Sequence, residues 1–183
     1  MRCTTRFTIV AAIGLLCAAA IAARPDEIKP GLVCEIFDFD QDDPLEDFPV
    51  IPAKTQPAVK KIDSRIAVDA AAQPWPGTDL RENFYVRWTG IIRIPSDGRY
   101  RFFLESDDGS RLFIDGKQVV DNGGRHSMRE VADRCDLKAG DHEIKIEFFQ
   151  GDVSAGCRFL WRPPEGKKEI VPPSVLFHRQ SQE

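Results

Sequence analysis

The sequence predicts an all-β domain, built as an antiparallel β-sandwich or barrel. Apolar residues recur at every second position in several segments, which is the pattern of half-buried strands. Turns rich in Gly, Asp and Pro separate these segments at short intervals. No segment shows the sustained apolar period of an amphipathic helix, and 183 residues suffice for one domain. Together these observations favour two packed sheets or a closed barrel.

The longest alternation lies in residues 84–94, and the next follows in residues 99–105. The inward-facing residues of these two segments are Phe84, Val86, Trp88, Ile92 and Ile94 in the first and Tyr100, Phe102 and Leu104 in the second. Because successive side chains of a strand point to opposite faces, both sets are expected in the core. Trp88 and Trp161 alternate with core residues and are assigned to the interior.

A hairpin is expected next. Leu112 and Ile114 continue the alternation, and Asp115-Gly116 is a strong two-residue hairpin signal, so residues 117–121 should form the return strand. Further strands are expected over residues 131–137, 142–148 and 157–161, the last ending before Pro163-Pro164. His142 begins one of these strands and is expected to be a hydrogen-bonded interior residue.

The remaining segments carry weaker signals. Residues 40–64 change from acidic to Pro-rich to basic and are interpreted mainly as a long loop. Residues 67–73 have room for one helical turn, and the Pro-rich stretch from Pro163 to Pro173 is expected to close the domain. The sequence thus divides into residues 1–23 and a single domain over residues 24–183, with its core at 31–173.

Residues 1–23 have the features of a secretory signal peptide. Arg2 and Arg6 are followed by an apolar run and then by small residues, and Ala20-Ile21-Ala22 fits the cleavage pattern. The apolar run is too short for a membrane span. The expected location is therefore secreted, periplasmic or at the cell surface.

Export leaves three cysteines in the chain, Cys34, Cys135 and Cys157. Two of them could pair in an oxidising compartment, in any of three combinations. Alternatively, all three are buried thiols that behave as small hydrophobic side chains.

Charge and motifs exclude some function classes. The formal charge is −4 and the basic residues are scattered, which argues against a nucleic-acid partner. The sequence has neither the G-x-S-x-G pattern of serine hydrolases nor the H-E-x-x-H pattern of zinc proteases, so we expect no enzyme. The many Asp and Glu residues leave a paired-carboxylate glycosidase site open.

Seven short motifs resemble the PA14 domain family in their order and spacing. They are FYVRWTG (84–90), PSDGRY (95–100), SDDGSRL (106–112), IDG (114–116), NGGRH (122–126), LKAGDH (137–142) and FLW (159–161). The resemblance implies a β-sandwich-like barrel over nearly the whole of the exported chain.

The resemblance also implies a candidate site. In the sugar-binding members of the family, two adjacent aspartates joined by a cis peptide coordinate calcium, and the calcium holds vicinal hydroxyls of a sugar. Asp107 and Asp108 occupy those positions here. The counterpart of the second family loop is residues 150–156, where Asp152 or main-chain carbonyls would complete the calcium site and Gln150 and Ser154 lie close to the ligand.

Two residue assignments have competing interpretations. Asp107 and Asp108 could instead accept hydrogen bonds from turn amides and cap the hairpin, with no metal involved. Trp75, flanked by prolines, could stack on a sugar ring or cover one end of the barrel. His126 lies in a Gly-rich turn and is expected to tie that loop through main-chain hydrogen bonds.

The sequence therefore predicts an exported module that binds a glycan or glycoconjugate, with Ca²⁺ as a candidate cofactor. The alternative is a metal-free module that docks onto another protein of the cell envelope.

Overall fold

The computed structural model describes residues 27–39 and 41–180. The predicted signal peptide lies outside these residues. Within them the chain forms strands and one short 3₁₀ helix, η1 (Pro173–Val175), and none of its helices is long and apolar enough to cross a membrane. The predicted all-β class is confirmed.

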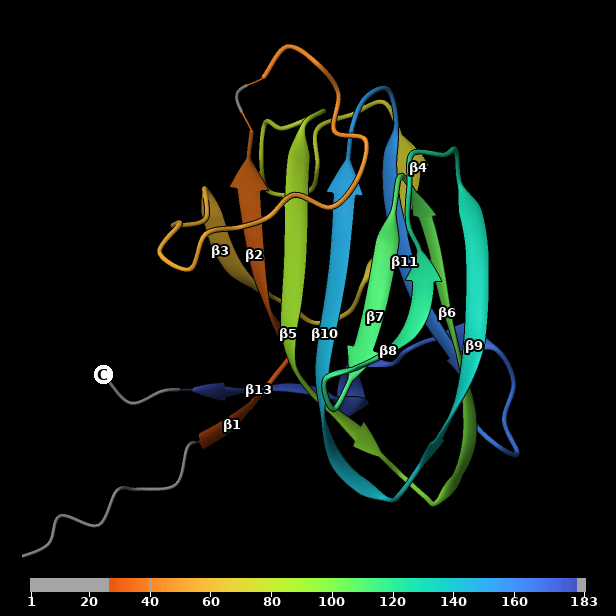
Figure 1. The fold of residues 1–183 in the computed structure, drawn as a ribbon. Helices are drawn as coiled ribbons and strands as arrows, with labels where there is room; N and C mark the ends of the chain where they lie inside the picture. Colours follow the sequence, from red (N-terminus) through yellow and green to blue (C-terminus); the bar gives the residue numbers. More distant parts are fainter. Residues whose placement is uncertain (1–26, 40, 181–183) are drawn as a thin grey trace, which may run out of the picture.

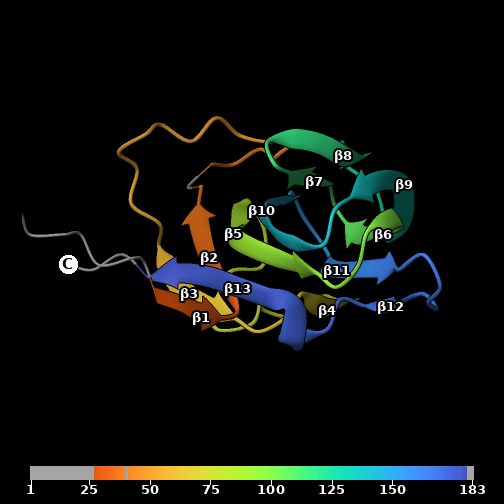
Figure 2. The same ribbon diagram turned by 90° about the horizontal axis from the view of Figure 1, so that it is seen from below.

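The strands form two antiparallel sheets that pack face to face (Figures 1 and 2). The larger sheet contains β1 (Glu27–Pro30), β2 (Leu32–Asp38), β3 (Val59–Asp63), β5 (Phe84–Ile94), β7 (Ser110–Ile114), β8 (Lys117–Asn122), β10 (Gly140–Gln150) and β13 (Leu176–Gln180). The smaller sheet contains β4 (Ala67–Ala71), β6 (Gly98–Asp107), β9 (Arg129–Leu137), β11 (Ala155–Arg162) and β12 (Glu169–Ile170).

The alternating residues of both sheets meet in one core. Among the described residues, Trp88 and Trp161 are 1% and 2% exposed, as their alternation predicted. Each indole N–H still has a partner: Trp88 Nε1 donates to Asp63 Oδ2 at 2.8 Å and Trp161 Nε1 to Glu169 Oε1 at 3.2 Å. The core therefore buries large aromatic surface without leaving these donors unpaired.

Two segments differ from the sequence-based expectation. Residues 67–73 form no helical turn, because Ala67–Ala71 is strand β4 and pairs with β11. The stretch interpreted as a loop over residues 40–64 ends in strand β3, which pairs with β2. Strands β1 and β13 both lie wholly outside residues 31–173, side by side at one edge of the large sheet (Figure 2).

Trp75 lies in the core and does not form a sugar platform. Its side chain is 2% exposed and stacks on Phe148 with ring centroids 5.0 Å apart and an interplanar angle of 21°. It also contacts Phe84 and Trp88. A ring buried among other core rings has no free face for a ligand, so this candidate ligand-binding residue is corrected to a core residue.

The segment between β2 and β3 covers the outer face of the large sheet at one end (Figure 1). We call residues 41–58 the covering loop. Beneath it lies a second apolar cluster, in which Leu45 of the loop packs with Phe37, Tyr85 and Phe149 of the sheet. Asn83 fastens the loop, because its Oδ1 accepts the Leu45 N–H at 2.9 Å and its Nδ2 donates to the Gln41 carbonyl at 3.1 Å.

The three cysteines of the described chain are free thiols. Cys34 and Cys157 are fully buried, and burial raises the pKa of both thiols far above the ordinary value. They fill the core as small hydrophobic side chains, as the second interpretation expected of all three cysteines, whereas Cys135 is only partly buried.

Candidate functional site

Asp107 and Asp108 lie where β6 turns into β7, at the end of the sandwich that also holds the end of β10 and the start of β11 (Figure 1). The peptide bond between them is cis, as the family resemblance implied. Gly109 completes the turn against a core ring: a Cβ built there would lie 2.3 Å from Phe149 Cε1. The turn sequence is therefore constrained by close packing at Gly109.

Two loops donate main-chain hydrogen bonds to Asp108. Its Oδ1 accepts the N–H of His126 at 2.8 Å, and its Oδ2 accepts the N–H of Gly151 at 2.9 Å. Asp108 is 5% exposed, so these charge-assisted bonds fix an almost buried carboxylate. Asp107 is more exposed than Asp108.

His126 ties the β8–β9 loop to itself, as expected. Its Nδ1 lies 2.9 Å from the Ser127 carbonyl oxygen and its Nε2 lies 3.1 Å from the Asn122 carbonyl oxygen. Each ring nitrogen thus lies within hydrogen-bonding distance of a main-chain carbonyl, to which a nitrogen that carries a proton donates. The ring holds the loop that presents the His126 main-chain N–H to Asp108.

A buried polar network supports the aspartates from below. Ser106 Oγ and Ser110 Oγ are 2.7 Å apart, and Asn122 Nδ2 donates to Ser106 Oγ at 2.9 Å. Arg129 Nε donates to Asn122 Oδ1 at 2.9 Å. Because these groups join β6, β7, β8 and β9, the Asp turn sits on a braced platform.

The loop between β10 and β11 forms the other side of the site. Val153 has φ 66° and a side chain that is 75% exposed, which is an uncommon conformation for a β-branched residue. Gln150 is fully buried, and its Nε2 donates to the Asp152 carbonyl. Gln150 Oε1 is buried without a hydrogen-bond partner in the described part of the chain.

These loops enclose a polar pocket of about 540 Å³. Its lining residues are Asp107, Asp108, Arg125, His126, Ser127, Asp152, Val153 and Ser154. The structure thus brings together four of the predicted site residues, Asp107, Asp108, Asp152 and Ser154. Gln150 lies behind the wall as a support of the loop, and Trp75 is in the core.

Both adjacent carboxylates are more costly to ionise than an ordinary Asp. Burial and the neighbouring Asp108 charge raise the pKa of Asp107 above its ordinary value. The pKa of Asp108 is also raised, by burial, although the N–H groups of Gly151 and His126 act in the opposite direction. A bound cation would remove this penalty, because an opposite charge favours the ionised form.

The oxygen-rich lining fits a hard cation such as Ca²⁺, which takes six to eight oxygen ligands from carboxylates, carbonyls and water. Each Asp108 oxygen accepts one N–H and keeps a second lone pair. However, no group of three or more His, Cys, Asp or Glu side chains converges to metal-binding distance among the residues described. Asp152 in particular turns its Oδ1 to Arg125, at 2.7 Å.

Sequence reasoning missed Arg125 as a site residue. It lies within the NGGRH motif at residues 122–126, but a motif match gives no indication that its side chain reaches across to the β10–β11 loop. The contact partner on the covering loop, Glu46, is 79 residues away in sequence and no periodicity connects the two.

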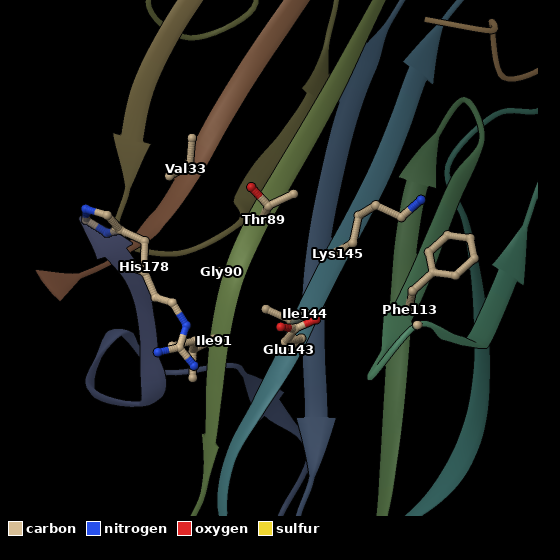
Figure 3. A pocket seen from close by; sticks show the side chains of 11 residues that line it. Val33, Thr89, Gly90, Ile91, Phe113, Glu143, Ile144, Lys145 and His178 are labelled. Carbon is tan, nitrogen blue, oxygen red and sulfur yellow. The ribbon is translucent and has the colours of Figure 1, made fainter. Parts of the chain in front are cut away.

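A second hollow of about 540 Å³ lies on the outer face of the large sheet, between β2, β5, β10, β7 and β13 (Figure 3). Thr89, Lys145 and Phe113 form one row across it and point away from the sheet. Lys145 Nζ lies 4.1 Å from the Phe113 ring centroid. This hollow is separate from the aspartate pocket and contains one acidic residue, Glu143.

The family profile of the PA14 domain matches residues 29–174. The two-sheet fold and the paired aspartates at its end thus define a PA14-type β-sandwich, and the chain belongs to the PA14 domain family.

Known relatives place this domain in several contexts. The anti-sigma-I factor RsgI3 of Acetivibrio thermocellus is 33% identical over 98 residues, which cover 53% of this chain and 15% of that protein. The chain thus corresponds to a small part of that relative.

Two solved structures share the fold over most of both chains. The PA14 domain of the antifreeze protein MpAFP superposes with a TM-score of 0.72 at 15% identity, covering 87% of this chain and 96% of that one. The PA14 sugar-binding domain of an RTX adhesin gives a TM-score of 0.69 at 20% identity, with 81% and 98% covered.

Proposed function

We propose that this chain is an exported carbohydrate-binding module whose site is the aspartate pocket, and that sugar binding there depends on calcium. The observation that carries the proposal is the convergence of Asp107, Asp108 and the Asp152 loop on one polar pocket. The similarity in fold to a sugar-binding PA14 domain supports the same assignment.

In this proposal Asp107, Asp108 and oxygens of the Asp152 loop hold the calcium. The ion, when bound, supplies a positive centre that attracts the vicinal hydroxyls of a sugar. Asp108 is positioned in advance by the N–H groups of His126 and Gly151, so little ordering is needed at this residue.

The chain's other pocket residues provide direct contacts to the sugar. Ser154 and Ser127 offer hydroxyl groups that can donate to or accept from sugar hydroxyls. The exposed Val153 side chain offers apolar surface to the C–H face of the ring. Such a site, with both polar and apolar surface, is suited to recognition of one or two terminal sugar units.

A glycan array tests the proposal when it is probed in calcium and in EDTA. We expect binding to a defined set of glycans in calcium and its loss in EDTA. Asp107→Asn should show the same loss in calcium, and Asp79→Asn, an acidic residue outside the pocket, should bind as the wild type does. Glycan binding that persists in EDTA and in Asp107→Asn would contradict the proposal.

A metal-free docking module for an envelope protein is the second candidate. The hydrogen bonds from His126 and Gly151 to both oxygens of Asp108 favour it, since they satisfy this carboxylate without a metal. This candidate predicts that calcium changes neither the melting temperature nor partner binding, because a ligand that binds the native state must stabilise it.

A further inference from the structure

Arg125 joins two acidic side chains that belong to different loops. Its Nη1 donates to Glu46 Oε1 at 2.7 Å and its Nη2 donates to Asp152 Oδ1 at 2.7 Å. Glu46 belongs to the covering loop and Asp152 to the β10–β11 loop. One guanidinium at the wall of the aspartate pocket therefore bridges the two loops.

The side-chain stem of Arg125 passes close to Gly151. A Cβ built on Gly151 would lie 3.3 Å from both Cδ and Nε of Arg125 and 2.7 Å from the Leu45 carbonyl oxygen. The absence of a side chain at Gly151 lets the arginine stem lie along the loop. The same glycine donates its N–H to Asp108.

The charges at the pocket explain the place of a basic side chain, Arg125, in its wall. Asp107, Asp108 and Asp152 line the pocket, and Arg125 is the single Lys or Arg side chain among its described lining residues. With Glu46, the local formal charge is four negative and one positive, or −3 in total. In the metal-free protein, Arg125 is the group that offsets part of this repulsion.

We propose that Arg125 is the resident counter-cation of the site, and that a divalent ion displaces its guanidinium from Asp152 while Glu46 retains it. This inference rests on the proposed function, because it concerns how the same pocket accepts calcium. The carboxylate of Asp152 has one position beside Arg125 and another toward the ion, and the two cations compete for it.

The geometry makes this exchange inexpensive. Arg125 bonds its two acceptors through different nitrogens, so the bond to Glu46 remains when the bond to Asp152 breaks. Glu46 is 72% exposed at its side chain, so it can follow the guanidinium toward solvent. Calcium binding then replaces one ion pair of Asp152 by another and reduces the excess negative charge of the site from −3 to −1.

A competing cation lowers the apparent calcium affinity, so its removal should raise that affinity. Arg125→Gln should bind calcium roughly two- to fivefold more tightly than the wild type, the range expected for loss of one exposed ion pair. Glu46→Gln should bind calcium more weakly, since Asp152 is then the one carboxylate partner left to Arg125. If Arg125 only held the two loops in place, Arg125→Gln would bind calcium more weakly, because the Asp152 loop would be less well ordered.

The experiment is a titration of the EDTA-stripped chain with calcium alone, followed by calorimetry, with the melting temperature of each metal-free variant as a second readout. Arg93→Gln is the matched control. Arg93 forms a bidentate ion pair with Asp141, which lies at the opposite end of β10 from the pocket. The rise per residue of a strand puts this pair about 30 Å from the pocket. Arg93→Gln removes one positive charge, as Arg125→Gln does.

Tighter binding by Arg125→Gln, a lower melting temperature of the metal-free variant and an unchanged affinity of Arg93→Gln are the expected results. Equal or weaker binding by Arg125→Gln overturns the inference and leaves the proposed function intact. Binding by Arg125→Gln but not by the wild type supports the inference and overturns calcium dependence of the natural protein. Absence of binding by both overturns both.

Discussion

The Oδ2 atom of Asp108 accepts the main-chain N–H of Gly151 at 2.9 Å, across 43 residues of sequence. This bond joins the Asp turn to the loop that forms the opposite side of the pocket. Together with the His126 N–H on Oδ1, it makes Asp108 a structural residue as well as a candidate ligand. Asp107 has a lesser structural role, so the two neighbours should respond differently to the same substitution.

Asp108→Asn should lower the free energy of unfolding of the metal-free protein by about 1–3 kcal/mol, because the amide NH₂ group would face one of the two buried N–H donors. Asp107→Asn removes a repelling charge, so it should not destabilise. Both variants should lose calcium binding. Urea unfolding in EDTA measures the difference, and equal destabilisation would show that the hydrogen bonds to Asp108 matter little.

The pH dependence of stability should show that the ionised form of Asp107 destabilises the metal-free fold. Its pKa is raised in the fold by burial and by Asp108, so ionisation costs the native state stability, and this cost vanishes as the pH falls through the raised pKa. In EDTA, wild type should therefore be less stable than Asp107→Asn at about pH 7, with a smaller difference at about pH 4, where an ordinary Asp begins to titrate. Thermal unfolding of the pair at several pH values tests this, and a difference that grows towards acid contradicts it.

Acid pH should weaken calcium binding, although it relieves the repulsion that destabilises the metal-free protein. Calcium binds the ionised carboxylates, and the raised pKa values of Asp107 and Asp108 mean that protons compete at a higher pH than for ordinary aspartates. Affinity should fall from neutral pH through the acid range, as measured by calorimetric titration. An affinity that is constant down to about pH 4 would place the ion elsewhere.

The contact between Gly109 and Phe149 should make the Asp turn intolerant of a methyl group. Gly109→Ala is expected to destabilise the protein by about 1–3 kcal/mol and to weaken calcium binding, because Phe149 is fully buried and has no room to retreat. Gly123→Ala is the control: its new Cβ would meet the ends of the Asp121 and Arg111 side chains, which can move. Equal stability of the two variants in urea unfolding would contradict the packing argument.

Trp75 should matter for stability and not for sugar. Trp75→Phe is expected to lower the free energy of unfolding by about 1–3 kcal/mol, since it leaves space beside Phe148 in the core. The affinity of the folded variant for glycans should equal that of the wild type. A selective loss of glycan binding without destabilisation would restore the sugar-platform interpretation.

The main strands of both sheets could be predicted from the sequence because period-2 alternation is a direct consequence of burying one face. Trp88 and Trp161 lie where their alternation places them. Strand β4 was missed because Ala67–Ala71 is rich in alanine, which favours helix when taken alone. Its small residues serve packing: a Cβ on Gly156 would lie 2.6 Å from Ala70 Cα.

The candidate site could be predicted only in part, because a motif identifies some of its residues and long-range contacts bring in the others. The adjacent aspartates stand out in the family motif, so Asp107 and Asp108 could be named from sequence. The Arg125 bridge to Glu46 and Asp152 depends on three loops meeting at one end of the sandwich. Local sequence patterns do not predict contacts between loops that are far apart in the chain. The position of Trp75 in the core could not be predicted either, because its flanking prolines are typical of exposed loops.

Thermal unfolding of the EDTA-stripped chain, with and without calcium, tests the central claim most directly. Extracellular calcium modules bind with dissociation constants of about 0.1–1 mM. At a hundredfold excess over that constant, the melting temperature of the wild type should rise by about 5–10 °C. Asp107→Asn should show no rise. If calcium leaves the melting temperature of the wild type unchanged, the aspartate pocket is not a calcium site and the calcium-dependent account of sugar binding is wrong.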